Sequence, residues 1–394
     1  MQVDKGLFYL VAILIGMGMI FVYSLSSFAV RFYDYSDTHF FVRQALIGAV
    51  AVFLMWGISR LNPTQMVGSI SLFNAIGFSI LIVSAFLILI MPFLPASLVP
   101  TIGGARRWIR IGGFSLAPVE FFKIGVVFFF AWSLNRKFRY EKPFWVEFGS
   151  FFPYIIFFII ITAFVGVLQK DLGQTLVIAI TLLVLGLYAG TSKKIFIALF
   201  GLLAVGIYAL IVSAPHRIRR FESWWMVNQD FILKFLPQSW GESLRVTGLD
   251  EPYQISHSFN AISNGNLYGV GLGQGTFKLG FLSEVHTDFI LAGIAEEMGF
   301  VMIFIIICLV WLVVSKILQI SSTALRRDQR LFALGIAVVI ASSFLINAYG
   351  VISITPVKGI AVPFLSYGGS SILALCVGVG IVLMVSKNAE WNTQ

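Results

Sequence analysis

Long uncharged stretches alternate with short charged segments along most of the chain. Uncharged runs of roughly bilayer-spanning length cover residues 6–30, 44–59, 148–169, 172–192, 195–214, 298–315, 331–357 and 359–386. A helix that crosses a bilayer needs about 20 predominantly apolar residues. Two further spans are expected at about 68–92, before a proline-rich stretch, and at about 117–135, where two charged residues interrupt the pattern. The pattern predicts an all-α integral membrane protein built as a bundle of ten transmembrane helices.

The composition strengthens this prediction. Of the 394 residues, 58% are hydrophobic and only 11% are charged, whereas soluble domains carry about 25% charged residues. An ordinary soluble enzyme, a disordered scaffold and a disulfide-rich secreted domain are therefore excluded. The net charge of +9 is typical of loops that face anionic headgroups, so no nucleic-acid partner is expected.

The distribution of Lys and Arg predicts the topology. With a cytoplasmic N-terminus, 13 of them lie on the inner side and seven lie outside, once six in the longest loop and Lys123 are set aside. The positive-inside rule applies to short loops, so both termini are expected in the cytoplasm. Residues 1–394 then form a single polytopic domain, with extracytoplasmic loops at about 93–116 and, between helices 7 and 8, at about 214–286.

The first outer loop and the helix after it carry unusual charges. Arg107 and Trp108 suit a lipid phosphate, because arginine offers a bidentate fork and tryptophan sits well at headgroup depth; anchoring of the helices is the alternative. Glu120 and Lys123 are three residues apart and can pair, either at a functional site or as a structural ion pair. Asp171 lies in a tight turn, where capping of the next helix would explain it.

The longest loop contains three features. Residues 217–240 place apolar side chains along one stripe, which predicts an amphipathic helix lying on the membrane. The run of alternating glycines at 269–275 indicates sharp turns or a close backbone approach. Asp288 follows at the start of a span, where Thr287 or Asp288 could cap the helix, or Asp288 could act as a general base.

The last candidate segment is a glycine- and serine-rich stretch at 356–371. Polar backbone at membrane depth is tolerated where it lines a cavity, so Ser366, Tyr367 and Ser370 are candidate substrate contacts, and Lys358 is a candidate phosphate contact. A simple helix break is the alternative. The four histidines show no metal-ligand spacing.

Six motifs occur in one order along the chain. They are GARRWI at 104–109, PVEFFK at 118–123, KDLG at 170–173, YGVGLGQG at 268–275, HTDF at 286–289 and PVKGIAVPFLSYGGSS at 356–371. Together they resemble the FtsW/RodA/SpoVE (SEDS) family, and EVHTDF and PVKG bring the chain closer to the FtsW branch. Ala117 and Val119 stand where the family usually has Gln and Ser, and Lys170 stands where it usually has Pro. The segment 221–251 looks longer than usual and has no assigned role.

The resemblance implies a peptidoglycan glycosyltransferase that polymerises lipid II on the outer side of the bacterial cytoplasmic membrane, at the division septum. It also implies a class B penicillin-binding protein as partner, beside other divisome membrane proteins. The family's essential outer-loop aspartate falls on Asp288, which favours a catalytic role over a helix cap.

We expect an inverting transfer in which Asp288 accepts the proton of the acceptor's sugar hydroxyl. Arg107, with Lys123, Lys278 and Lys358, would stabilise the departing undecaprenyl diphosphate, and a divalent cation, Mg²⁺ or Mn²⁺, could share that task. Trp108 and Glu120 complete the candidate substrate-binding set. The alternatives are a lipid II flippase, a polymerase that serves cell elongation, and a structural anchor of the division machinery.

Overall fold

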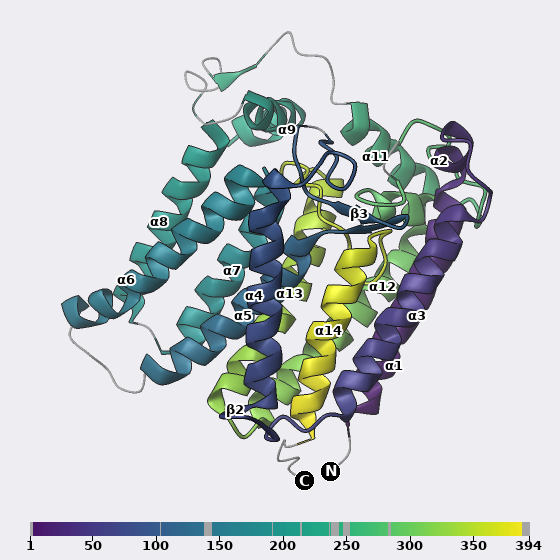
Figure 1. Ribbon diagram of the computed structural model, residues 1–394. Helices are drawn as coiled ribbons and strands as arrows, with labels where there is room; N and C mark the ends of the chain where they lie inside the picture. Colours follow the sequence, from purple (N-terminus) through teal and green to yellow (C-terminus); the bar gives the residue numbers. More distant parts are fainter. Residues whose placement is uncertain are drawn as a thin grey trace.

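The protein is described by a computed structural model in which residues 3–102, 104–137, 144–190, 192–212, 215–235, 237, 244–246, 253–282 and 285–387 are placed. Helices dominate the described chain (Figure 1). The long apolar ones are α1 (Lys5–Leu25), α3 (His39–Arg60), α4 (Leu72–Ile90), α5 (Pro118–Lys137), α12 (Ile290–Thr323), α13 (Arg327–Val351) and α14 (Gly369–Ser386). The all-α membrane-protein fold is therefore confirmed.

The remaining apolar helices are shorter or bent. Helix α6 (Phe144–Ile161) continues into a π-helical segment (Thr162–Leu168), and α7 (Leu172–Tyr188) follows it. Helices α8 (Lys193–Val212) and α9 (Pro215–Leu233) meet at an angle of 102°. Within the described residues, seven helices are long and apolar enough to cross a membrane, or eight if the bent pair is one span. The count of ten stays a prediction, as does the division of the chain into one domain.

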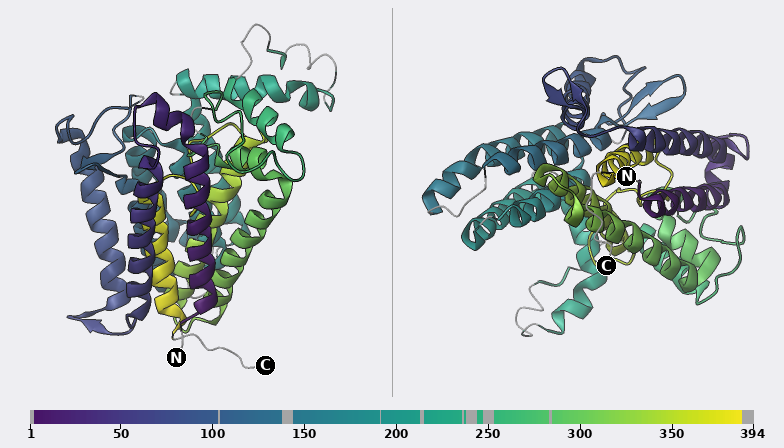
Figure 2. Two further views of the ribbon diagram at one scale, coloured as in Figure 1. Left: turned by 90° about the vertical axis from the view of Figure 1, so that its right-hand side faces the viewer. Right: turned by 90° about the horizontal axis from the view of Figure 1, so that it is seen from below.

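Three helices form the centre of the bundle. Over the most apolar stretch of 18 residues, 72%, 78% and 83% of α5, α13 and α14 is buried inside the protein. The corresponding share is 22% in each of α3, α4 and α12. Helix α14 packs against α3 and α5, and α13 packs against α12, α5 and α7; the view from below shows α14 between the purple and green helices (Figure 2). The outer helices therefore turn apolar faces outward, as lipid contact requires.

One end of the bundle holds both ends of the chain, and the other holds the loops. Helix α1 begins where α14 ends (Figure 1), and the backbone N–H of Asp4 donates to the Ser386 hydroxyl. The shared side of the termini was predicted; its assignment to the cytoplasm stays a prediction. Short strands β1 (Met66–Val67) and β2 (Ile70–Ser71) lie at this end.

We call the opposite end the outer end. The outer end holds the short elements that connect the long helices: α2 (Ser27–Phe32), η1 (Met91–Phe93), β3 (Ile109–Ile111), β4 (Phe114–Leu116), α9 and α11 (Tyr253–Gly265). Helix α9 corresponds to the amphipathic helix predicted at 217–240; the end of that range, at Trp240, lies outside the described residues. The long segment 221–251 is likewise described only in part.

One span boundary was wrong. The helix expected from residue 359 begins only at Gly369, and residues 352–368 form a loop without regular structure. The start of the span predicted at 298–315 agrees with the part of α12 that follows the break at Gly299; before the break, α12 begins at Ile290, and the buried acids Glu296 and Glu297 of that part find partners inside the protein.

The glycine run at 269–275 contacts α12 where that helix is broken. Gly299 has a φ of 71°, which interrupts the helical hydrogen bonds. Two backbone N–H groups of the run donate to the carbonyls of Glu296 and Glu297 at 3.0 and 2.9 Å. A Cβ on Gly269 would lie 2.2 Å from the carbonyl oxygen of Glu297, so only glycine permits this contact. The expected close backbone approach is confirmed.

Candidate active site

Asp288 lies between three segments that are far apart in the sequence. Helix α12 begins at Ile290, with Phe289 in the N-cap position; the capping role of Thr287 or Asp288 stays a prediction. The amide of Asn347, in α13, donates to the carbonyl of Asp288 and to that of Ile360, both at 2.7 Å. A Cβ on Gly359 would lie 3.0 Å from Asp288 Oδ2. The half-exposed Asp288 side chain therefore sits against the loop 352–368.

The serine-rich end of that loop holds the segment around Asp288 in place. The Ser366 hydroxyl donates to the carbonyl of Thr287 at 2.7 Å and accepts from the N–H of Val362. The N–H of Tyr367 donates to the carbonyl of His286 at 2.9 Å. Ser366 is 1% exposed, so the contacts that the structure gives it fix the backbone next to Asp288, and a substrate contact there stays a prediction.

Ser370 has a similar linking position on a different pair of elements. Its hydroxyl donates to the carbonyl of Ser115 at 3.1 Å and accepts from the N–H of Ala117 at 2.8 Å. These bonds attach the start of α14 to strand β4 and to the first turn of α5. Ser370 thus anchors the hairpin that carries Arg107 and Trp108 toward the site.

Aromatic side chains pack beside the Asp288 segment. The rings of Phe40 and His286 lie 4.9 Å apart, and those of Phe40 and Tyr367 lie 5.0 Å apart. Burial lowers the pKa of His286 to about 4, so its imidazole is neutral at neutral pH. Tyr367 therefore takes part in a packed aromatic group that borders Asp288.

Arg107 binds a turn. Its Nε donates to the carbonyl of Gln169 at 2.8 Å and its Nη2 to that of Lys170 at 2.9 Å. Asp171 caps α7 by accepting from the N–H of Gln174, which confirms the capping interpretation. Trp108 is half-buried and packs against the main core. The guanidinium keeps further N–H groups available for a ligand, since arginine carries five.

Glu120 and Lys123 form the expected pair and share a third partner. Lys123 Nζ lies 2.9 Å from Glu120 Oε2 and 3.1 Å from Gln174 Oε1, and Gln174 Nε2 lies 2.7 Å from Glu120 Oε1. Lys123 is 2% exposed. The three side chains satisfy one another, an arrangement typical of a structural ion pair. Gln174 could not be predicted from the sequence, because its contacts run between α5 and α7.

Lys278 lies elsewhere, in a buried ion pair on the other side of α12. Its Nζ lies 2.6 Å from Glu297 Oε1 and donates to the carbonyl of Ser24 at 3.1 Å. The neighbouring Glu296 accepts from the N–H and the hydroxyl of Thr276. The structure thus does not bring Lys278 to Asp288. The adjacent acids Glu296 and Glu297 are the sequence signal for this cluster.

Cations gather around the loop that contacts Asp288. Burial, followed by the charges of Arg220 and Arg217, lowers the pKa of Lys358 to about 8. Burial, followed by the charge of Arg107, also lowers the pKa of Arg217. Among the described residues, Lys358 and Arg220 have no carboxylate within 4.0 Å. We call Arg107, Arg217, Arg220 and Lys358 the cation cluster; Arg217 and Arg220 had been assigned only to an amphipathic helix.

The described residues do not form a resident metal centre. Nowhere in the described ranges do three His, Cys, Asp or Glu side chains come together as metal ligands. A divalent cation, Mg²⁺ or Mn²⁺, stays a prediction.

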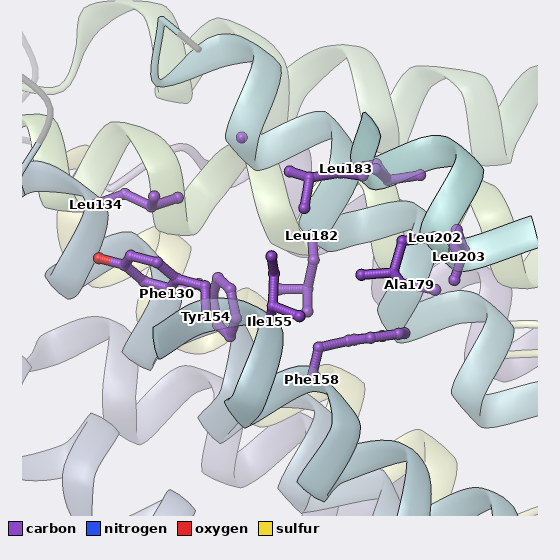
Figure 3. Close-up of a pocket in the computed structure, with 12 residues that line it drawn as sticks. Phe130, Leu134, Tyr154, Ile155, Phe158, Ala179, Leu182, Leu183, Leu202 and Leu203 are labelled. Carbon is purple, nitrogen blue, oxygen red and sulfur yellow. The ribbon is translucent and has the colours of Figure 1, made fainter. Parts of the chain in front are cut away.

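A separate cavity of about 70 Å³ is apolar (Figure 3). It lies among α5, α6, α7 and α8 and is lined by leucine, isoleucine and phenylalanine side chains. Its one ionisable lining group, Tyr154, is hydrogen-bonded to Ser133 at 2.7 Å. This space offers packing surface and carries no candidate chemistry.

The fold and the site together define a class of protein, a helical integral membrane protein with a carboxylate and a group of cations at the end of the bundle opposite its termini. Residues 5–391 match the family of cell cycle proteins that includes FtsW, RodA and SpoVE. The chain belongs to this family.

Relatives and solved structures agree with this assignment. The chain is 44% identical to a probable peptidoglycan glycosyltransferase FtsW of Helicobacter pylori, covering 98% of this chain and 99% of the relative. It is 32% identical to the protein of that name in Bacillus subtilis, covering 99% and 92%. The crystal structure of the rod shape determining protein RodA of Thermus thermophilus has a TM-score of 0.65 at 21% identity, covering 100% and 99%.

A second similar structure belongs to a peptidoglycan synthase complex that coordinates polymerization and crosslinking. Its TM-score is 0.70 at 22% identity, with 98% of each chain covered. Both structural likenesses concern the fold.

Proposed function

We propose that this protein is a peptidoglycan glycosyltransferase that polymerises lipid II into glycan strands at the outer face of the cytoplasmic membrane. The observation that carries the proposal is the position of the Asp288 carboxylate against Gly359, one residue from Lys358 in the cation cluster. A carboxylate beside a group of cations suits a reaction that removes a proton at one point and expels a diphosphate at another.

The proposed step is a displacement with inversion. Asp288 Oδ2 accepts the proton of the 4-hydroxyl of the acceptor lipid II, and that oxygen forms a bond to the anomeric carbon of the growing strand. The bond between this carbon and the diphosphate oxygen breaks, and undecaprenyl diphosphate leaves with the electron pair. Lys358 and Arg220 stabilise the charge that develops on the leaving group, and Arg107 contributes its remaining N–H groups.

Lys358 is a better candidate for this task than Lys123 or Lys278. The latter two are at most 4% exposed and already bind carboxylates. A phosphate could recruit them only by breaking buried ion pairs, which costs several kcal/mol. In our proposal the pairs Glu120–Lys123 and Glu297–Lys278 support the site from behind.

The biological setting follows from the relatives. The names of the curated relatives favour a role in septal wall synthesis over elongation. A class B penicillin-binding protein is the proposed partner, in line with the synthase complex of similar fold. Cytoplasmic termini would then place the Asp288 end of the bundle on the outer side, where the crosslinking partner acts.

The test is polymerisation by the purified protein with its partner, using fluorescent lipid II and gel analysis of the products. Asp288→Asn should lose at least about 100-fold in rate, since a general base contributes about 10²- to 10⁴-fold. Asp230→Asn is the matched control, because Asp230, which lies in α9, forms an exposed ion pair with Arg245. A glycan ladder of normal intensity from Asp288→Asn would refute the base assignment. Lipid scrambling without any ladder from the wild type would favour a flippase.

A further inference from the structure

A second cavity lies at the outer end, beside α1 and α2. It has a volume of about 420 Å³ and is bordered by Tyr23, Ser27, Arg31, Asp37 and Lys278, together with the glycine run. This volume falls within the range of ligand sites, about 300–1,000 Å³. The cavity has both polar and apolar walls and is distinct from the apolar space among α5, α6, α7 and α8.

Several polar groups of this cavity lack partners inside the protein. The Ser27 hydroxyl is buried and makes no hydrogen bond. Lys278 is 4% exposed and uses two acceptors, although an ammonium group carries three donors. Arg31 and Asp37 are exposed at the rim of the cavity, and in the described part of the chain neither has an ion-pair partner within 4.0 Å. The buried Ser27 hydroxyl without a partner and the buried ammonium with a third donor indicate a polar ligand, and the two charges at the rim are accessible to it.

A row of aromatic rings leads to the Asp288 segment from residues 33–35, which lie in the chain between Arg31 and Asp37 of the cavity. Tyr33 stacks on Tyr35 at 5.8 Å, and Tyr35 stacks on His39 at 4.1 Å with an interplanar angle of 10°. Tyr35 also meets Phe40 at 6.1 Å, and Phe40 contacts His286, two residues before Asp288. We call these rings the aromatic row. Its outer members remain open, since Tyr33 and Tyr35 are 59% and 45% exposed.

The chemistry of the two features fits a sugar better than a phosphate. A sugar ring has an apolar C–H face that packs on the electron-rich face of an aromatic ring. Its hydroxyl rim both donates and accepts hydrogen bonds, so it can serve the Arg31 guanidinium and the Asp37 carboxylate at once. A phosphate would be attracted by Arg31 and Lys278 but repelled by Asp37, and it would gain little from the row.

We propose that the aromatic row and the cavity bordered by Arg31 and Asp37 form a saccharide-binding site that holds the growing glycan strand behind the reacting sugar. This inference rests on the proposed glycosyltransferase function. The row begins beside Asp288 and leads away from it, so sugars already joined would lie along it while the reducing end stays at the cation cluster. A strand held in this way dissociates less often between additions and grows longer.

The experiment measures strand length in the complex of the full chain with its partner, at equal lipid II consumption. Tyr35→Ala and Arg31→Ala should each shorten the mean strand about two- to tenfold, the range that a single aromatic contact provides. Tyr35→Phe keeps the ring and should preserve strand length. Phe93→Ala is the matched control, because Phe93 is an aromatic residue at the outer end, 85% exposed and outside the row.

A binding measurement keeps the test decisive if a variant polymerises poorly. In the Asp288→Asn background, saturation-transfer NMR with a soluble N-acetylglucosaminyl–N-acetylmuramyl tetrasaccharide should give a signal that Tyr35→Ala removes and Phe93→Ala retains. Strands of control length and an unchanged NMR signal in Tyr35→Ala would overturn the saccharide site, while a ladder that depends on Asp288 would leave the proposed function standing. Tighter binding of phosphatidylglycerol vesicles by Asp37→Asn, without a saccharide signal, would identify the cavity as a lipid phosphate site.

Discussion

The buried triad of Glu120, Lys123 and Gln174 permits a quantitative prediction. Lys123→Met would remove a cation that lies 2.9 Å from Glu120 Oε2 and 3.1 Å from Gln174 Oε1. Glu120 would then remain buried with one amide donor. Removing one partner of a buried ion pair costs about 3–5 kcal/mol, whereas replacing both partners by neutral groups is often neutral. We therefore expect Lys123→Met to destabilise strongly and Glu120→Gln/Lys123→Met to recover most of the loss, a coupling of at least about 2 kcal/mol.

Unfolding of the detergent-solubilised protein, followed by tryptophan fluorescence, measures these differences. Arg245→Met is the control, because Arg245 pairs with Asp230 at 2.8 Å and the two side chains are 52% and 73% exposed; such a pair contributes at most about 1 kcal/mol. The reasoning is refuted if Lys123→Met costs no more than this control, or if the double variant loses the sum of the two single losses. Polymerase assays on the same samples separate stability from substrate contact. A stable but inactive double variant would restore the substrate-binding interpretation of Glu120 and Lys123.

Three further predictions concern other parts of the outer end. Since the pKa of Lys358 is lowered to about 8, its charge is present below pH 8 and lost above it. Polymerisation should therefore decline as pH rises through 8, and Lys358→Arg should move this decline to higher pH in a pH–rate profile. An unchanged alkaline limb would contradict the role of Lys358 in stabilising the leaving diphosphate. Gly299→Ala should destabilise the folded protein by at least about 1–3 kcal/mol, because the φ of Gly299 is positive and a Cβ would lie 2.3 Å from the carbonyl oxygen of Leu267. Thermal unfolding measures this loss, and Gly201→Ala is the control because the space around its Cβ is open. Ser366→Ala should cost about 1 kcal/mol and reduce polymerisation, because the carbonyl of Thr287 loses its donor; full activity would show that this bond does not position Asp288.

The fold was largely predictable because a bilayer imposes a simple rule on sequence. Apolar runs such as the one at 331–357 correspond to long helices such as α13, since unpaired backbone is not tolerated in lipid. The rule failed where charge was satisfied at a distance. Glu296 and Glu297 look like the end of an apolar run, but they belong to α12, because Thr276 and Lys278 approach them from the preceding loop. The hydropathy of a local stretch of sequence does not reveal such long-range partners.

The candidate site was predictable where the chemistry is local. Asp288 and Lys358 stand out as isolated charges next to apolar or glycine-rich sequence, and the structure brings their segments into contact through Gly359. Arg217 and Arg220 could not be connected with them, because their position depends on the 102° bend between α8 and α9. The aromatic row could not be predicted either, because Tyr35 is connected to His286 only through Phe40 of α3, and that contact depends on tertiary packing.

The state of the buried charges also distinguishes an enzyme that works from one side from a carrier. A carrier that moved a lipid diphosphate across the bundle would need cations accessible within it, and among the described residues the buried candidate inside a long apolar helix is Lys123, in α5. It is closed within an ion pair of 2.9 Å, so passage of the headgroup would break a buried pair at a cost of several kcal/mol. The cations of the outer end are in the opposite situation. Within the described chain, Arg217, Arg220 and Lys358 lack an ion-pair carboxylate, and after burial the charges of Arg220 and Arg217 lower the pKa of Lys358. A diphosphate would relieve that repulsion where it arises, beside Asp288, without entering the bundle. The charge distribution therefore favours chemistry at one face over transport, and it predicts that Lys358→Met weakens diphosphate binding, whereas Glu120→Gln/Lys123→Met leaves it intact.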